Sequence, residues 1–217
     1  MQGANLEGNQ NDAHARYGPD GFVRPQRFVL SYLYDIPGPH DPASLTGRFL
    51  GGWAISGVTT IQSGERLNLT FADPNNVFGI GTGALNTDPA QIASGCSANQ
   101  LVTSGSVQRK LNNYFNAACF TTPPVIGDDG IATTFGNAGP GIVGGPDQVN
   151  FDFAVIKRTT FGLDERRNLE FRAEFFNLFN HTQFANPDSA FNDPTFGVID
   201  ATSVAPRIIQ LALKLNF

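Results

Sequence analysis

The sequence predicts an all-β chain of antiparallel, up-and-down strands. Three observations indicate this fold class. Side chains alternate between apolar and polar in five segments, helical periodicity is almost absent, and the connections between the segments alternate between short and long. The strands are expected near residues 27–34, 49–62, 148–161, 167–179 and 207–217 of the 217-residue chain.

The first three expected strands carry mostly apolar residues at every second position. A strand points successive side chains to opposite faces, so each of these segments has one predominantly apolar face. The residues in question are Phe28, Leu30, Tyr32 and Tyr34, then Trp53, Ile55, Thr59 and Ile61, then Val149, Phe151, Phe153 and Val155.

The fourth expected strand, residues 167–179, sets an aromatic stripe against a charged one. Phe171 and Phe175 lie on one face, and Glu170, Arg172 and Glu174 lie on the other. A soluble β-sandwich strand shows the same pattern when one face meets a core and the other meets water. This strand alone therefore leaves a sandwich and a membrane barrel both open.

The last expected strand alternates up to the final residue. Leu211, Leu213 and Leu215 share a face, Gln210 and Lys214 lie on the other, and the chain ends on Phe217. A closing strand of an outer-membrane β-barrel is typically of this kind, because one face meets lipid and the other a polar lumen. We therefore expect Leu211, Leu213, Leu215, Phe171 and Phe175 to face lipid. In the same barrel Gln210, Lys214, Glu170, Arg172 and Glu174 would face the lumen.

The connections favour a barrel over a sandwich. Residues 35–48 form a moderate turn and residues 162–165 a tight one, whereas residues 63–147 and 180–206 are long. Membrane barrels have short turns on the periplasmic side and long loops outside. With Phe217 at the periplasmic end, both long segments fall outside. The large outer loop 63–147 would then contribute to a vestibule that contacts solute.

Composition narrows the class of protein further. Charged residues make up 15% of the chain, the net charge is −5, and no Lys/Arg cluster is long enough to follow a phosphate backbone, so we expect no nucleic-acid partner. No run of about 18 apolar residues is present, so no transmembrane helix is predicted. Residues 1–8 do not resemble a signal peptide. Because an outer-membrane protein must be exported, we expect residues 1–217 to be the C-terminal fragment of a longer protein.

Few residues indicate chemistry. Cys96 and Cys119 are expected to form a disulfide if the chain is exported, and two free thiols or a weak metal site are the alternatives. The glycine-rich stretches 79–83 and 139–144 lack the strand–helix context of a phosphate loop. The three histidines stand far apart in sequence. We therefore expect no catalytic residue, no metal, no cofactor and no enzymatic activity.

Three stretches resemble a known family. They are residues 135–139 (FGNAG) followed by Gly145, Pro146 and residues 150–152 (NFD), residues 172–187 (RAEFFNLFNHTQFANP), and the terminal strand ending on Phe217. These stretches are similar to the last strands of Oar-like TonB-dependent receptors of the acidobacterial type. Residues 27–32 (RFVLSY) and 53–57 (WAISG) also fit the family pattern.

The resemblance implies a location and a function. It implies a transmembrane barrel of about 22 strands in the bacterial outer membrane, of which this chain supplies about five. It also implies energy-coupled uptake of a large, scarce solute. Outer-membrane lipid, the barrel-assembly machinery, which reads the strand ending on Phe217, and TonB, reached through an N-terminal plug absent from this chain, are the implied partners. The fragment alone is not expected to transport.

Two other functions remain open at this point. A passive porin-like or adhesive outer-membrane barrel would share the strand chemistry but lack the plug. A soluble extracellular β-sandwich that binds carbohydrate would pack Phe171 and Phe175 against a second sheet.

Overall fold

The computed structural model describes residues 12, 14–39, 44–72, 87–126, 134–161 and 167–217. The chain divides into two compact units. The sheet unit comprises Gln26–Gln62, Gln148–Gln183 and Val204–Phe217, and the loop unit comprises Met1–Pro25, Ser63–Asp147 and Phe184–Ser203. The predicted tight turn at residues 162–165 and the segment 1–8 lie outside the described residues.

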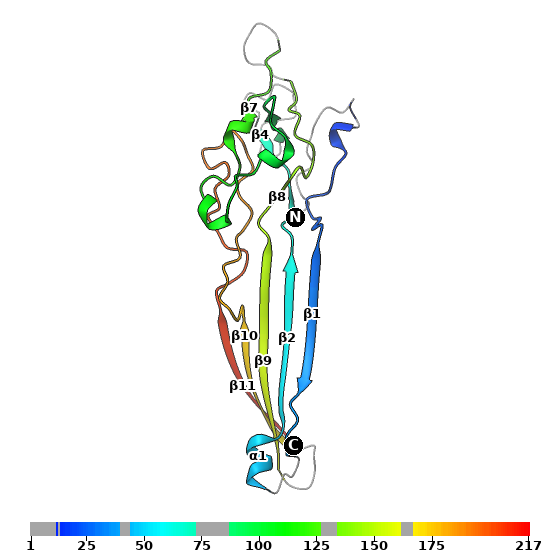
Figure 1. Ribbon diagram of the computed structural model, residues 1–217, viewed down its shortest axis with the longest axis vertical. Coiled ribbons are helices and arrows are strands. Elements are labelled where there is room, and N and C mark those ends of the chain that lie inside the picture. Colours follow the sequence, from blue (N-terminus) through cyan, green and yellow to red (C-terminus); the bar gives the residue numbers. More distant parts are fainter. Residues whose placement is uncertain (1–11, 13, 40–43, 73–86, 127–133, 162–166) are drawn as a thin grey trace. The chain divides into compact units, whose positions relative to one another are not determined.

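The sheet unit is one five-stranded antiparallel sheet, as predicted (Figure 1). Its strands are β1 (Arg27–Asp35), β2 (Trp53–Gln62), β9 (Gln148–Thr160), β10 (Asn168–Phe176) and β11 (Ile208–Asn216). Their order in space is β1-β2-β9-β10-β11, so successive long strands are neighbours. The all-β, antiparallel, up-and-down fold class predicted from the sequence is confirmed.

The register brings the apolar stripes of neighbouring strands together. Phe171 on β10 pairs with Leu213 on β11, and Phe175 pairs with Ile209. Because side chains alternate along every strand, each such pair fixes the facing of the whole strand. The five apolar stripes therefore lie on one face of the sheet, and the other face carries the charged stripe of β10.

The predicted start of the second strand at residue 49 is wrong. Phe49 and Leu50 belong to a short helix, α1 (Leu45–Leu50), and β2 begins at Trp53. The Ser44 hydroxyl caps this helix by accepting the Gly47 N–H at 3.0 Å. Gly52, with a φ of +69°, turns the chain after the helix. The expected strand extends to residue 49 because apolar residues continue there, although Ser44 and Gly52 indicate a helix and a turn.

The fourth strand is shorter than predicted, ending at Phe176 instead of residue 179. Asn177 and Asn180 both have a φ of +52°, a left-handed conformation that asparagine tolerates better than most residues and that no strand continues through. Asn177, which directly follows Phe176, therefore ends β10, and Asn180 adopts the same conformation three residues later.

The loop unit is folded around its own core. Its short elements are η1 (His14–Arg16), β3 (Arg66–Leu67), β4 (Thr70–Ala72), β5 (Thr87–Pro89), β6 (Gln91–Ile92), η2 (Ala98–Gln100), η3 (Val107–Lys110), η4 (Ala117–Cys119), β7 (Phe120–Thr121) and β8 (Val143–Gly144). The strands pair as β3–β8, β4–β5 and β6–β7. Segments that are distant in sequence meet in the core, where the Phe196 ring centroid lies 5.1 Å from that of Phe115 and 5.2 Å from that of Phe120. Burial of these aromatic rings stabilises loops that have little regular secondary structure.

Within the parts of the chain that the structure describes, no helix has the length and apolar character needed to cross a bilayer.

Candidate functional site

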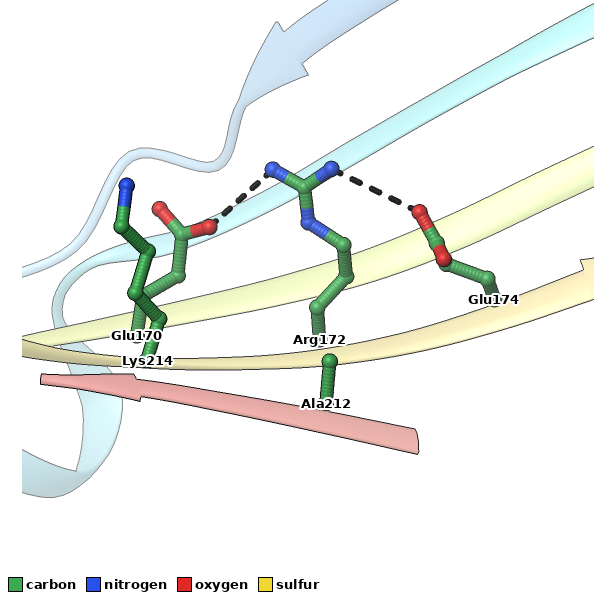
Figure 2. Close-up of a pocket in the computed structure, with 5 residues that line it drawn as sticks. All are labelled: Glu170, Arg172, Glu174, Ala212 and Lys214. Atoms are coloured by element: carbon green, nitrogen blue, oxygen red, sulfur yellow. Dashed lines mark hydrogen bonds and ion pairs between the residues drawn. The ribbon is translucent and has the colours of Figure 1, made fainter. Parts of the chain in front are cut away.

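The candidate site is the charged stripe on the polar face of the sheet. Glu170 of β10 lies between two guanidinium groups: Arg158 Nε on β9 is 2.8 Å from its Oε2, and Arg172 Nη2 is 3.0 Å from its Oε1. Figure 2 shows Arg172 reaching Glu170 on one side and Glu174 on the other. Glu170 is the most buried member, since 14% of its side chain is exposed. Both of its oxygens are therefore held by cations.

Glu170, Arg172 and Glu174 line a hollow of about 330 Å³ together with two residues of β11. Lys214 pairs in register with Glu170, and Ala212 pairs with Arg172. The small Ala212 side chain leaves room opposite the long Arg172 side chain (Figure 2). The sequence prediction that Glu170, Arg172, Glu174 and Lys214 share a face agrees with this geometry.

The site carries more positive than negative charge. Arg158, Arg172 and Lys214 supply three cations, against the two carboxylates of Glu170 and Glu174. Among the described residues, Lys214 makes no hydrogen bond or ion pair that would neutralise it. The arrangement can hold water and contact an anionic or polar group, and no nucleophile with an activating base is present among its lining residues.

Polar contacts continue along this face beyond the charged stripe. Gln62 Nε2 donates to Gln148 Oε1 at 2.6 Å near one end of the sheet, and Asn216 Nδ2 donates to Asn168 Oδ1 at 2.7 Å near the other. These cross-strand side-chain pairs connect β2 to β9 and β11 to β10. The face therefore carries polar side chains at both ends of the sheet, although it also carries the apolar residues Val29, Leu33, Val58, Ile156, Phe176 and Ile208.

The opposite face carries the residues predicted to meet lipid. Leu211, Leu213 and Leu215 are 67%, 68% and 56% exposed, and Phe171 and Phe175 lie on the same face. Contiguous apolar surface of this extent is rare on soluble monomers and marks an interaction surface. Phe217 follows β11 and is almost fully exposed.

A polar cluster at the end of β10 was missed from the sequence. The Asn177 N–H donates to Asp152 Oδ1 at 2.9 Å, and the Asn177 side chain exchanges hydrogen bonds with the backbone of His181. Gln183, which is 1% exposed, bonds to both backbone groups of Val149. Asn177, His181 and Gln183 all lie in the segment 172–187 that resembles the receptor family. Asparagine next to the strand end was the signal that could have identified the cluster.

The two cysteines meet in the loop unit. Cys96 and Cys119 form a disulfide with the Sγ atoms 2.08 Å apart, across a sequence separation of 23. Cys119 is buried in the aromatic core, so the bridge fastens the segment around Cys96 to that core. Within the described part of the chain, no three His, Cys, Asp or Glu side chains lie close enough to hold a metal ion.

Burial shifts the titration of two neighbouring groups in this unit. The Tyr114 hydroxyl donates to the Gly144 carbonyl at 2.9 Å, and burial, helped by the negative charge of Asp147, raises the pKa of Tyr114 to about 12. The Lys110 ammonium lies 4.5 Å from the Tyr114 ring centroid and donates to the Thr103 carbonyl. Burial lowers the pKa of Lys110 against the opposing pull of Asp147.

A sheet with one apolar and one charged face, joined by long folded loops, is the arrangement expected of a β-barrel membrane protein. Residues 2–210 match the model of a family described as outer membrane beta barrel domain. The chain belongs to this family, and its location is the bacterial outer membrane. No curated protein and no solved structure matches the chain.

The family excludes one of the alternatives left open by the sequence. A protein of the outer membrane is not a soluble extracellular sandwich, so packing of Phe171 and Phe175 against a second sheet is not needed to explain their facing.

Proposed function

We propose that this chain forms the closing strands of a TonB-dependent outer-membrane transporter of the Oar-like type, which takes up a large, scarce solute. The observation that carries the proposal is the two-faced sheet, with its salt-bridged hollow on one face and bare apolar side chains on the other. The resemblance of residues 172–187 to Oar-like receptors adds the family type. Asn177, His181 and Gln183 of this segment belong to the polar cluster at the end of β10.

The two faces give the sheet its place in the membrane. Leu211, Leu213, Leu215, Phe171 and Phe175 face lipid in this proposal, while the hollow around Glu170 and Arg172 faces a water-filled lumen. The connection that holds α1 and the C-terminus lie at the same end of the sheet, which we assign to the periplasm (Figure 1). The loop unit then belongs to the extracellular side, where it contacts solute.

The five strands need further strands to complete a barrel. Within the described residues, β1 and β11 each pair on one side only. In lipid each unpaired backbone N–H or C=O group costs several kcal/mol, so an open sheet is not stable there. We therefore propose that the chain transports only as part of a complete barrel, which couples to TonB through an N-terminal plug.

The remaining partners follow from the same proposal. The exposed strand β11 and Phe217 are the segment that the barrel-assembly machinery reads. We propose no catalytic step for the chain. The hollow takes part only in the passage of solute.

Uptake by living cells tests the function. Cells with and without the gene would be given radiolabelled oligosaccharides, peptides and metal chelates in turn, and accumulation inside the cell would be measured. We expect one class to accumulate only when the gene is present, and accumulation to stop when a protonophore dissipates the ion gradient. Uptake that persists with the protonophore would favour a passive pore. Surface retention without accumulation would favour an adhesive barrel.

A further inference from the structure

Helix α1 turns its apolar side chains away from the protein. Leu45 and Phe49 are both 71% exposed, and Gly47 is buried. Residues four apart lie on the same side of a helix, and a residue two positions on lies nearly opposite. Glycine therefore faces the rest of the protein, and the Leu45–Phe49 pair faces outward.

Two side chains of the apolar face determine where α1 lies. The Trp53 Nε1–H donates to the Phe49 carbonyl at 2.9 Å, and Lys157 Nζ donates to the Gly51 carbonyl. Trp53 and Lys157 are cross-strand partners, and Lys157 is also the partner of Phe171 on the apolar face. Both side chains thus end on carbonyls at the C-terminal end of α1, so this end lies on the apolar side of the sheet.

The close approach of backbones fixes the connection in this position. A Cβ on Gly51 would lie 2.1 Å from the Pro39 carbonyl oxygen, and a Cβ on Gly38 would lie 2.8 Å from that of Leu50. These distances are shorter than van der Waals contact, so both positions require glycine. The two ends of the connection therefore pass directly against each other, which limits how far α1 can swing away.

Trp53 and Lys157 also mark the limit of the apolar face. Lys157 Nζ lies 5.5 Å from the centroid of the Trp53 ring system. Of the described residues on the apolar face of the five strands, Lys157 alone is charged. Tryptophan and lysine are the residues that place an apolar body among acyl chains and a polar end in water. We therefore place the boundary between acyl chains and headgroups at the height of Trp53 and Lys157 on the sheet.

We propose that α1 is an interfacial anchor that lies in the periplasmic leaflet, with Leu45 and Phe49 among the acyl chains of glycerophospholipids. Lipid is the expected partner of this helix, because the exposed side of α1 adjoins the lipid-facing surface through Trp53 and Lys157. The inference rests on the proposed function for that surface and for the orientation. A short amphipathic helix of this kind binds through the apolar area that it buries in the headgroup region.

Spin labelling of the complete barrel in phosphatidylethanolamine–phosphatidylglycerol vesicles tests the anchor. Single nitroxide labels at Leu45 and Phe49 would be compared with a label at Leu213, predicted to face lipid, and one at Gln210, predicted to face water. Collisions with oxygen report lipid, and collisions with a water-soluble nickel complex report solvent.

We expect the oxygen-to-nickel collision ratio at Leu45 and Phe49 to shift toward the value at Leu213 and away from the value at Gln210. A ratio at Leu45 and Phe49 equal to that at Gln210 would overturn the anchor. So would protection from both reagents, which would mean that a second copy or a soluble protein covers the helix. A solvent-like ratio at Leu213 would overturn the lipid-facing assignment itself, and the anchor with it.

Discussion

The side chain of Gln183 takes the place of a strand partner for the backbone of Val149. Its Oε1 accepts the Val149 N–H at 2.8 Å and its Nε2 donates to the Val149 carbonyl. Gln183 is 1% exposed, so water does not compete for these bonds. One glutamine therefore continues the hydrogen bonding of β9 beyond the last residue of β10.

Replacing Gln183 tests this relationship. Gln183→Ala leaves the N–H and C=O of Val149 without these partners, and we expect the free energy of unfolding to fall by about 1–3 kcal/mol. Gln183→Glu can still accept from the N–H but cannot donate to the carbonyl, so it should not restore stability. Urea unfolding of the complete barrel in detergent measures both, with the exposed Gln210→Ala as control. Equal stability of Gln183→Ala and Gln210→Ala would mean that the hydrogen bonds of Gln183 to the Val149 backbone do not stabilise the protein.

Asn177 combines a left-handed backbone with side-chain bonds, and two substitutions separate these contributions. Asn177→Gly keeps the φ of +52° accessible but removes the bonds to His181, so we expect a loss of about 1 kcal/mol. Asn177→Ala adds the strain of a left-handed residue, about 1 kcal/mol more. The same unfolding assay ranks the two variants. If Ala proved as stable as Gly, the left-handed conformation would not be what ends β10.

These contacts separate the features that local sequence patterns encode from those that depend on distant residues. Alternation of side chains is a local property, so it revealed the facing of Leu213 and Glu170 without any knowledge of strand partners. The Gln183–Val149 contact joins residues 34 positions apart, and no periodicity encodes it. Helix α1 was misread because Phe49 and Leu50 continue an apolar pattern, whereas the cap at Ser44 and the turn at Gly52 determine the local structure. The compact loop unit depends on contacts between distant segments, such as Phe115 with Phe196, which the sequence does not display.

Removal of the disulfide tests the stability of the loop unit. Cys96→Ser together with Cys119→Ser opens a loop with a sequence separation of 23. In the chain-entropy description this costs about 3 kcal/mol. We expect faster cleavage of the loop unit by added protease, measured on the complete barrel in intact cells. Heat-modified migration of the barrel in gels should stay unchanged, because the bridge joins no residues of the sheet unit. Unchanged protease resistance would show that the aromatic core holds the unit without the bridge.

The ion pairs on the polar face should contribute little to stability. Arg158 is 48% exposed, although Glu170 is only 14% exposed, and water therefore screens their attraction. A double-mutant cycle with Arg158→Ala and Glu170→Ala should give a coupling energy of about 0.2–1 kcal/mol. Glu170→Lys should lower the free energy of unfolding more than either alanine substitution, because it adds a cation beside Arg158, Arg172 and Lys214. Glu174→Lys, which opposes Arg172 alone among these cations, is the control. A coupling energy well above this range would mean that the hollow excludes water.

The pKa of Tyr114 predicts a loss of loop stability in alkaline solution. Its folded value is about 12, against an ordinary 10.0, because burial and Asp147 both disfavour the phenolate. The folded unit thus holds the phenol proton more tightly than the unfolded chain does. The resulting stabilisation is complete below pH 10, declines as the pH rises from 10 to 12, and is lost above that. It amounts to about 3 kcal/mol at most.

Protease resistance of the loop unit, measured across this pH interval, checks the loss, and the absorbance of tyrosinate reports the titration. Tyr114→Phe removes the phenol and its bond to the Gly144 carbonyl, so the variant should be less stable at neutral pH but less sensitive to alkali. The comparison also separates Tyr114 from Lys110, whose titration both proteins share. An identical pH dependence of the two proteins would assign the alkaline loss to another group.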